Sequence, residues 1–396
     1  MAQVVTFIEN AFRRRTSTTS PHMPRSLAYE PRNALNAICP YYTMFPLEYP
    51  LRVLKKHKSG APVVMDPFCG RGTTLFAARS LGLAARGIDS SPVAVAVARA
   101  KLCNVDTEKT LALARTHLDV AANVQVPQSE FFEHAFTPQV LRAICAIRQG
   151  LMAAEQDTDE VVLLRAAMLG CLHGPTSKSI TSQSYFSNQM PRTFASKPDY
   201  SVRYWKAKSL KPPVADVLAV LRRKLDRLSA STLPNGVTVA HAVLGDSRFA
   251  KCLPAASRDF SVVVTSPPYY GMRTYVEDQW LRNWFLGGPE RVVYGQSEQL
   301  EHTGKDVFAK SLGSVWKNMA RTQEQELDMY IRFGVIPSAK SDAKALLRAS
   351  LEESGIGWKE ISVRAASTAS SGKRQADHMT KGSTAALEYD FHVKRT

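Results

Sequence analysis

The sequence predicts an α/β, Rossmann-like fold in which a mostly parallel, doubly wound sheet ends in a β-hairpin and carries a largely helical insertion. Short apolar runs suited to buried strands end in polar or glycine-rich turns, at residues 63–66, 87–89, 243–244, 262–265 and 328–333. Helical patterns follow several of these runs, as in βαβ units. Residues 358–366 and 387–394 alternate polar and apolar side chains on either side of a glycine-containing link, which is typical of a hairpin.

Composition indicates a globular protein with a polyanionic partner. The chain has 396 residues, of which 44% are hydrophobic and 22% charged, enough for one large core or two modest ones. Its formal net charge is +16 at pH 7, and such an excess of Lys and Arg favours nucleic acid as the partner. The alternative is charge spread over the surface for solubility.

The six cysteines are scattered, without a Cys-x-x-Cys pair or a nearby set of histidines that would hold a metal ion. No apolar run approaches the roughly 18 residues needed to cross a bilayer. Residues 1–10 lack the basic start and apolar core of a secretory signal. We therefore expect a cytoplasmic protein with reduced thiols, no metal ion and no membrane contact.

Residues 63–74 predict a strand, a tight turn and the start of a helix, in the sequence Val-Val-Met-Asp-Pro-Phe-Cys-Gly-Arg-Gly-Thr-Thr. Gly70 and Gly72 let the backbone turn close to a ligand. A triphosphate loop would need a lysine at the helix start, and a dinucleotide loop a Gly-x-Gly-x-x-Gly spacing; neither is present. Asp89 follows Asp66 at close to the roughly 20-residue offset at which Rossmann-type folds place an acid on ribose hydroxyls. Capping of the next helix is the alternative role for Asp89.

The run from Val262 to Tyr270 predicts a buried strand that ends in a rigid turn. Its consecutive valines suit a strand covered on both faces, and Pro267 and Pro268 cannot continue the ladder. The prolines hold Ser266 extended, so that carbonyls near Ser266 and Pro267 can accept both hydrogens of a planar amino group. Tyr269 supplies a flat face on which a base can stack. A diproline that merely ends the strand is the alternative.

Ser-Pro-Pro-Tyr after an apolar strand resembles the catalytic motif of the DNA amino-methyltransferases, which methylate the exocyclic amine of cytosine or adenine. The initial serine resembles the N4-cytosine branch most, since Asp-Pro-Pro-Tyr is more usual for N6-adenine. Residues 66–74 resemble the loop with which this family binds S-adenosylmethionine, and Gly245-Asp246-Ser247 resembles the motif that meets the adenine ring. Residues 39–54 resemble the segment that closes over the methionine end of the cofactor. A parallel sheet finished by a hairpin also resembles the methyltransferase fold.

The resemblance implies specific roles for individual residues. The catalytic residues would be Ser266, Pro267, Pro268 and Tyr269. The cofactor-binding residues would be Thr43, Met44, Phe45, Asp66, Phe68, Gly70, Gly72, Thr73, Asp89 and Asp246. Arg71 stands where a small residue is frequent in the family, which leaves its role open.

Residues 105–240 form the insertion and have no counterpart in a minimal catalytic domain. Their apolar periodicity predicts helices at 107–122, 159–172 and 214–228. Residues 175–213 combine many basic residues and a single acid, Asp199, with interleaved aromatics, a pattern that suits phosphate contacts and stacking on DNA. The aromatics are Tyr185, Phe186, Phe194, Tyr200, Tyr204 and Trp205. The candidate DNA contacts are Arg192, Lys197, Arg203, Lys206, Lys208, Lys211 and Arg273. The alternative is a solvated loop whose aromatics pack on its own helices.

After the catalytic turn, residues 277–286 place two tryptophans, a leucine and a phenylalanine at helical spacing, as expected for core residues. Residues 287–325 are polar and irregular, and we expect a loop facing DNA there. Four segments result. They are a basic N-terminal arm (1–33), the first part of the catalytic domain with the cofactor site (34–104), the helical insertion as candidate target-recognition region (105–240), and the second part of the catalytic domain with the catalytic turn and hairpin (241–396).

The resemblance implies a site-specific DNA methyltransferase that moves a methyl group from S-adenosylmethionine to N4 of cytosine, by direct transfer to a base flipped out of duplex DNA. Duplex DNA is then the partner, and a cognate restriction endonuclease is left open as another. An N6-adenine DNA enzyme, an RNA or protein amine methyltransferase, and a non-catalytic DNA-binding subunit are the alternatives. The catalytic turn lacks the Pro-Cys nucleophile that a carbon-5 cytosine enzyme would require.

Overall fold

The structure, a computed structural model, describes residues 31–41, 46–174, 183–190, 197–231, 240–271, 277–294, 300–336, 339–366 and 388–395. Within these ranges, one seven-stranded sheet has the strand order β3-β2-β1-β4-β5-β7-β6. The parallel strands are β1 (Val63–Asp66), β2 (Ala85–Asp89), β3 (Ala240–Leu244), β4 (Phe260–Thr265) and β5 (Leu327–Gly334). The hairpin strands are β6 (Lys359–Ala365) and β7 (Glu388–Arg395), and β7 pairs antiparallel with both β5 and β6. The predicted α/β class, the parallel sheet and its terminal hairpin are confirmed.

The order of the strands reverses between β1 and β4. β1 pairs with β2 on one side, where Asp66 lies opposite Gly87, and with β4 on the other, where Met65 lies opposite Val263. Open α/β sheets bind ligands beyond the carboxyl ends of their strands at such a switch point. The glycine-rich loop follows β1 and the diproline turn follows β4, so both begin at this point.

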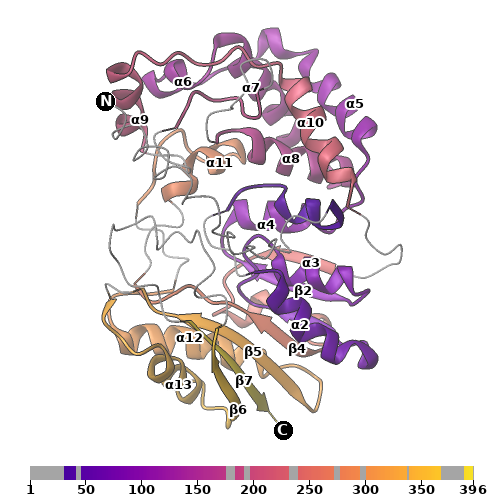
Figure 1. Cartoon of the computed structure of the whole chain (residues 1–396), viewed down its shortest axis with the longest axis vertical. Helices are drawn as coiled ribbons and strands as arrows, with labels where there is room; N and C mark the ends of the chain where they lie inside the picture. Colours follow the sequence, from indigo (N-terminus) through magenta and orange to yellow (C-terminus); the bar gives the residue numbers. More distant parts are fainter. Residues whose placement is uncertain are drawn as a thin grey trace, which may run out of the picture.

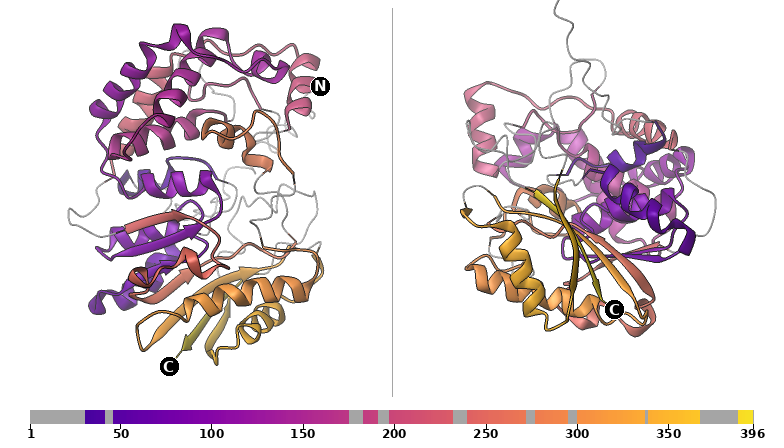
Figure 2. Two further views of the ribbon diagram at one scale, coloured as in Figure 1. Left: turned by 180° about the vertical axis from the view of Figure 1, so that it is seen from behind. Right: turned by 60° about the horizontal axis from the view of Figure 1, so that its bottom comes forward.

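Side chains of the central strands pack into two hydrophobic cores, one on each face of the sheet. Val262 and Val264 of β4 point into the core beneath the helices α2 (Glu48–His57), α3 (Thr73–Ser80) and α4 (Pro92–Ala100). Val263 points into the core beneath α12 (Lys305–Met319) and α13 (Ala343–Glu353). Figure 2 (right) shows the sheet between these two layers of helices. A strand buried on both faces explains the continuous apolar run in the sequence.

The expectation of a loop over residues 287–325 is wrong, because part of this stretch forms α12. Phe308, Leu312 and Trp316 are fully buried against the sheet. They stand four residues apart, the spacing of one helix face, so the sequence held a signal that identifies this helix.

The insertion forms a helical layer at one end of the molecule, while β5, β7 and β6 lie at the other (Figures 1 and 2). Its helices are α5 (Thr107–Leu118), α6 (Glu130–Ala135), α7 (Pro138–Met152), α8 (Asp159–Cys171), α9 (Pro198–Ala207) and α10 (Val217–Ser229). The predicted start of the last helix at Val214 is wrong. Val214 is 88% exposed, and α10 begins at Val217 because the Asp216 side chain accepts the Ala219 N–H at 3.0 Å and caps it.

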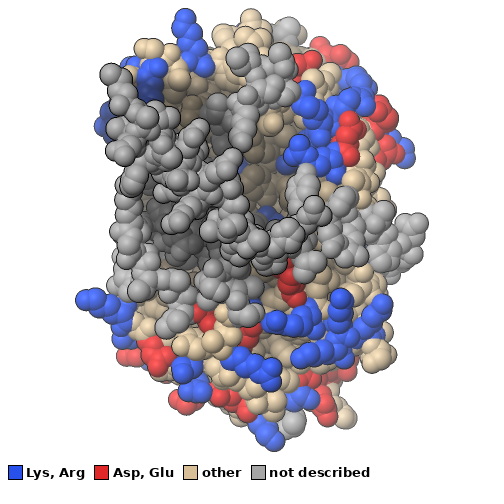
Figure 3. All heavy atoms as spheres, in the orientation of Figure 1, with Lys and Arg blue, Asp and Glu red and all other residues tan. Residues whose placement is uncertain are grey.

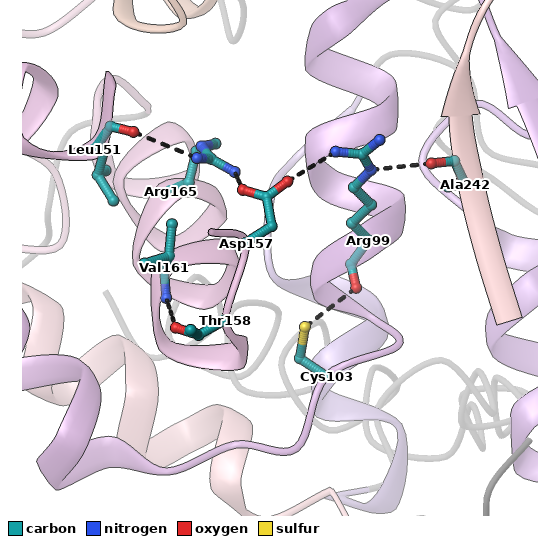
Figure 4. Close-up of polar contacts among 8 residues, drawn as sticks. All are labelled: Arg99, Cys103, Leu151, Asp157, Thr158, Val161, Arg165 and Ala242. Carbon is teal, nitrogen blue, oxygen red and sulfur yellow. Dashed lines mark hydrogen bonds and ion pairs between the residues drawn. The ribbon is translucent and has the colours of Figure 1, made fainter. Parts of the chain in front are cut away.

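A hydrogen-bonded bridge ties the insertion to the sheet (Figure 4). Arg99 of α4 donates to the Ala242 carbonyl of β3 at 2.9 Å and to Asp157 at 3.0 Å. The other oxygen of Asp157 accepts from Arg165 of α8 at 2.7 Å. Hydrogen bonds from the two arginines, that from Arg165 first, hold the pKa of Asp157 below its ordinary value. One hydrophobic cluster also continues from β1 and α3 through α4 into α7, α8 and α10.

The helix α11 (Trp280–Phe285) follows the diproline turn in sequence but packs on the insertion (Figure 1). Trp280 lies 4.7 Å from Phe131 of α6 between ring centroids, and Trp284 lies 4.6 Å from Phe132. Both tryptophans are buried, as expected from their helical spacing. Between the end of β4 at Thr265 and the start of α11 at Trp280, the chain thus reaches the helical layer.

Candidate active site

The last residues of β1 and β4 are joined by a hydrogen bond. The Thr265 hydroxyl donates to Oδ1 of Asp66 at 2.6 Å, and the Phe68 N–H donates to the same oxygen at 3.1 Å. Asp66 is fully buried. Burial raises the pKa of Asp66 to about 6, against the lowering effect of these hydrogen bonds. The Asp66 carboxylate thus lies beneath the glycine-rich loop and fastens it to the start of the diproline turn.

The two glycines of the loop serve different purposes. Both have positive φ, +50° at Gly70 and +74° at Gly72. A Cβ atom at Gly72 would lie 2.8 Å from Cβ of Ala98, so glycine is needed there for the loop to pack on α4. A Cβ atom at Gly70 would meet nothing nearer than the Phe68 carbonyl oxygen at 4.0 Å. The open space at Gly70 suits the close approach of a ligand. Phe68 is half-buried, and Thr73, the first residue of α3, is buried.

Asp89 holds the loop to the end of β2. Its Oδ2 accepts the Gly70 N–H at 2.8 Å, and its Oδ1 accepts the Ser91 N–H at 2.9 Å. The cap of α4 is the Ser91 hydroxyl, which accepts the Ala94 N–H, and not the carboxylate. Burial raises the pKa of Asp89. Each oxygen of a carboxylate can accept a second hydrogen bond, which is the chemistry that a ribose hydroxyl needs.

Asp246 follows β3 and is engaged by Arg248, a residue that the sequence did not single out. The guanidinium donates to both carboxylate oxygens, at 2.9 Å and 3.0 Å from Nε and at 2.6 Å from Nη2. The Arg248 N–H also donates to Oδ1 at 2.9 Å. Both side chains are largely shielded, with 13% and 14% of their surface exposed. An adenine amine that contacts Asp246 would therefore share the carboxylate with Arg248.

The loop after β3 touches the glycine-rich loop directly. The Ser247 hydroxyl donates to the Pro67 carbonyl at 2.5 Å. From the other side, Asn318 of α12 donates to the carbonyls of Ser247 and Arg248 at 2.9 Å each. The structure thus brings the loops that contain Asp66, Gly70, Asp89 and Asp246 to one edge of the sheet.

The diproline turn, Ser266–Tyr269, continues from this edge. Pro267 is buried, while Ser266, Pro268 and Tyr269 are half-buried. The Tyr269 ring lies edge-on against Phe333 of β5, with 6.2 Å between centroids. The next residue, Tyr270, forms an isolated parallel bridge with Val335. The end of β5 therefore supports the tyrosine end of the turn.

Some expected site residues lie outside the described ranges, namely Thr43, Met44, Phe45, Arg192 and Arg273. The described basic candidates are exposed on or near α9: Lys197, Arg203, Lys206, Lys208 and Lys211. Lys206 pairs with Glu130 of α6, and Lys208 lies over the Tyr204 ring at 5.3 Å. Lys197 lies over the Tyr294 ring at 4.9 Å.

Two of the aromatics in this region are core residues and cannot stack on DNA. Phe186 and Trp205 are fully buried, and Trp205 lies 5.4 Å from Phe131 between ring centroids. The packing alternative is right for these two rings. Tyr200 is 45% exposed, and Tyr204 is half-buried. On the face shown in Figure 3, Lys and Arg side chains lie over several parts of the described surface with Asp and Glu among them, so the charge does not form one patch there.

The described ranges contain no group of three His, Cys, Asp or Glu side chains placed to hold a metal ion. Among the helices of these ranges, none combines the length and apolar character that crossing a membrane demands. The cysteine thiols are free, and all are buried except Cys252, which is half-buried.

Residues 16–100 match the N6/N4 methyltransferase family model, which is described as DNA methylase. This match spans about a fifth of the chain. It includes the glycine-rich loop and Asp89, and it ends before the insertion and before the diproline turn. The match thus covers the part of the candidate site that contains Asp66, Gly70, Gly72 and Asp89.

A relative of known class is the type II methyltransferase M.MjaII of Methanocaldococcus jannaschii. It is 35% identical over 75 residues, which is 19% of this chain and 14% of that protein. The chain thus matches about one seventh of the length of this relative. Two structures of the rRNA methyltransferase AviRa from Streptomyces viridochromogenes are similar at 13% identity, with TM-scores of 0.32 and 0.34. The alignments cover 94% of both chains in the first case, and 91% of this chain and 89% of the other in the second. This likeness is too distant to carry an argument.

Proposed function

We propose that this protein is an S-adenosylmethionine-dependent DNA methyltransferase that modifies the N4 amine of cytosine in duplex DNA by direct transfer to a flipped base. The observation that carries the proposal is the hydrogen bond between Thr265 and Asp66. It fastens the start of the diproline turn to the glycine-rich loop at the switch point of the sheet, where α/β folds bind their ligands. A methyl donor on one element and an amine on the other would then share one site.

The described residues fit the proposed cofactor. The open space at Gly70 admits a ligand against the loop backbone, and Asp89 stands at the end of β2 with acceptor capacity for ribose hydroxyls. Asp246 would accept from the adenine amine, with Arg248 holding the carboxylate in place. Thr43, Met44 and Phe45 would close over the methionine end. When bound, S-adenosylmethionine supplies an electrophilic methyl group on a sulfonium.

The diproline turn would orient the target amine. Carbonyls at Ser266 and Pro267 accept its two hydrogens, which leaves the nitrogen lone pair directed at the reacting site. Tyr269 offers its ring as a stacking face, and its edge contact with Phe333 keeps the ring in place. Stacking offsets the few kcal/mol that extrusion of a base from the duplex costs. In this route the amine nitrogen would take the methyl group directly and release one of its protons to solvent, so no enzyme nucleophile takes part.

The basic surface around α9 would hold the DNA backbone. Both α9 and α11 pack against α6. Phe131 of α6 contacts Trp205 of α9 and Trp280 of α11. Because α11 begins eleven residues after Tyr269, phosphate contacts from Lys206, Lys208 and Lys211 would place a duplex next to the site. The described lysines would act together with Arg192 and Arg273. Similarity to a type II methyltransferase supports DNA as the substrate and leaves a cognate endonuclease open.

One experiment would identify the base that receives the methyl group. Unmethylated plasmid DNA and total RNA are each incubated with the protein and isotope-labelled S-adenosylmethionine, digested to nucleosides and separated by mass. The proposal expects label in N4-methylcytosine from DNA. Label in N6-methyladenine would move the activity to the adenine branch, which shares the same architecture. Label in RNA with none in DNA, or no transfer despite cofactor binding, would refute the proposed reaction.

A further inference from the structure

His302 lies beside the exit of the catalytic turn, in a stretch where the sequence offered no motif. Its Nδ1 lies 3.2 Å from the Gly271 amide nitrogen and accepts that hydrogen bond. A ring nitrogen that accepts carries no proton, so the neutral imidazole holds its proton on Nε2. Gly271 is the second residue after Tyr269, which makes His302 a near neighbour of the proposed stacking residue.

The backbone at Gly271 is closely packed and cannot shift easily. Its φ of +90° belongs to the region that side chains rarely adopt. A Cβ atom there would lie 2.9 Å from both Cγ1 of Ile336 and Cβ of Ala339. The carbonyl of Tyr270 accepts the Ile336 N–H at 3.4 Å. The residues that follow β5 thus pack against one side of Gly271, and His302 accepts the hydrogen bond of its amide.

Aromatic contacts link His302 to the rest of the turn. Its ring centroid lies 5.3 Å from that of Phe308 and 6.1 Å from that of Tyr270, and Tyr270 lies 5.2 Å from Phe308. Phe308 lies 6.1 Å from Phe333, against which Tyr269 packs. A movement of His302 or Tyr270 would therefore be passed through Phe308 and Phe333 to the Tyr269 ring, since packed rings tolerate little displacement.

We propose that His302 is a positioning residue for methyl transfer, which fixes the Gly271 amide through its Nδ1 acceptor and thereby sets the place of Tyr269. The role rests on the proposed function, because it concerns the geometry of the same turn. His302 needs no contact with the base or the cofactor. It acts on the rate of the chemical step and leaves cofactor binding alone.

Two variants separate the acceptor from the ring. His302→Phe keeps an aromatic ring and removes the acceptor, whereas His302→Asn offers an amide oxygen close to the place of Nδ1 and removes the ring. His241, exposed on β3, provides the matched controls His241→Phe and His241→Asn. Each protein is assayed for single-turnover methyl transfer to plasmid DNA, for binding of S-adenosylhomocysteine by calorimetry, and for amide hydrogen exchange at Gly271.

We expect His302→Phe to transfer methyl groups about tenfold more slowly, as the loss of one well-placed hydrogen bond implies. Its affinity for S-adenosylhomocysteine should stay within about twofold of that of the wild type, and Gly271 should exchange faster. His302→Asn should recover most of the rate and of the protection, and the His241 variants should match the wild type.

An unchanged transfer rate in His302→Phe overturns the inference, as does a loss in His302→Asn equal to that in His302→Phe. A wild-type protein that binds the cofactor product but methylates no nucleic acid refutes the proposed function instead. The His302 variants therefore test the inference, and the wild-type protein tests the proposed function.

Discussion

The hydroxyl of Thr265 donates a 2.6 Å hydrogen bond to the buried carboxylate of Asp66. This contact joins two residues that stand 199 positions apart in the chain and end neighbouring parallel strands. A carboxylate in such a place is costly to ionise, and the hydrogen bonds from Thr265 and Phe68 only partly compensate. We therefore expect the stability of the join between the two loops to depend on pH.

Asp66→Asn should remove a pH dependence of stability. The pKa of Asp66 is raised from an ordinary 3.8 to about 6, so the folded state holds a proton more tightly than the unfolded state does. The associated stability is complete below pH 4 and is lost as pH rises through about 6, by a few kcal/mol at most. Urea midpoints of wild type and variant at several pH values between 4 and 7 test this. Parallel curves would contradict the shift.

The glycine-rich loop offers a paired test. Gly72→Ala should lower the free energy of unfolding strongly, since its Cβ would lie 2.8 Å from that of Ala98. Gly70→Ala should cost only about 1–2 kcal/mol of left-handed strain, because the space around it is open. The added methyl group at Gly70 should instead weaken binding of S-adenosylhomocysteine by calorimetry. A larger loss of stability in Gly70→Ala than in Gly72→Ala would reverse the assigned roles.

Tyr269→Ala should abolish methyl transfer while cofactor affinity stays near that of the wild type, because the ring is proposed to contact the base and not the cofactor. Tyr269→Phe keeps the stacking face and the contact with Phe333, so it should retain most activity. Transfer is measured with labelled S-adenosylmethionine, and affinity by calorimetry with S-adenosylhomocysteine. Normal turnover in Tyr269→Ala would disprove the stacking role.

Replacement of Lys206, Lys208 and Lys211 by Ala should flatten the salt dependence of DNA binding. Removal of one phosphate interaction reduces the log–log slope by about 0.9, though the pairing of Lys206 with Glu130 limits its share. The control replaces the exposed Lys55, Lys56 and Lys58 at the end of α2. Fluorescence anisotropy at a series of salt concentrations gives both slopes. Equal slopes in the two triple variants would place DNA elsewhere.

The strands and their loops were predictable because their signals are local. Val262, Val263 and Val264 divide between two cores, and a strand buried on both faces must read as an unbroken apolar run. Prolines and glycines then mark where each strand ends. These signals also located the turn and the glycine-rich loop whose ends Thr265 and Asp66 join.

Other features depend on contacts between distant residues or on the conformation of a loop. Trp280 packs on Phe131, and the apolar periodicity of α11 cannot predict which residue it packs against. Arg248 donates a hydrogen bond to Asp246, two residues earlier. This contact forms only in one particular conformation of the turn after β3. His302 is a lone histidine in a polar stretch. The missed helix α12 is different, because the spacing of Phe308, Leu312 and Trp316 could have revealed it.

The docking of α11 on the insertion limits how this protein can be re-engineered. Trp280, Leu281, Trp284 and Phe285 are all buried, yet they belong to the segment after the diproline turn. A chimera that exchanged residues 105–239 alone would leave these side chains facing a foreign surface. Transplanting a different insertion would therefore require grafting α11 from the same donor along with it.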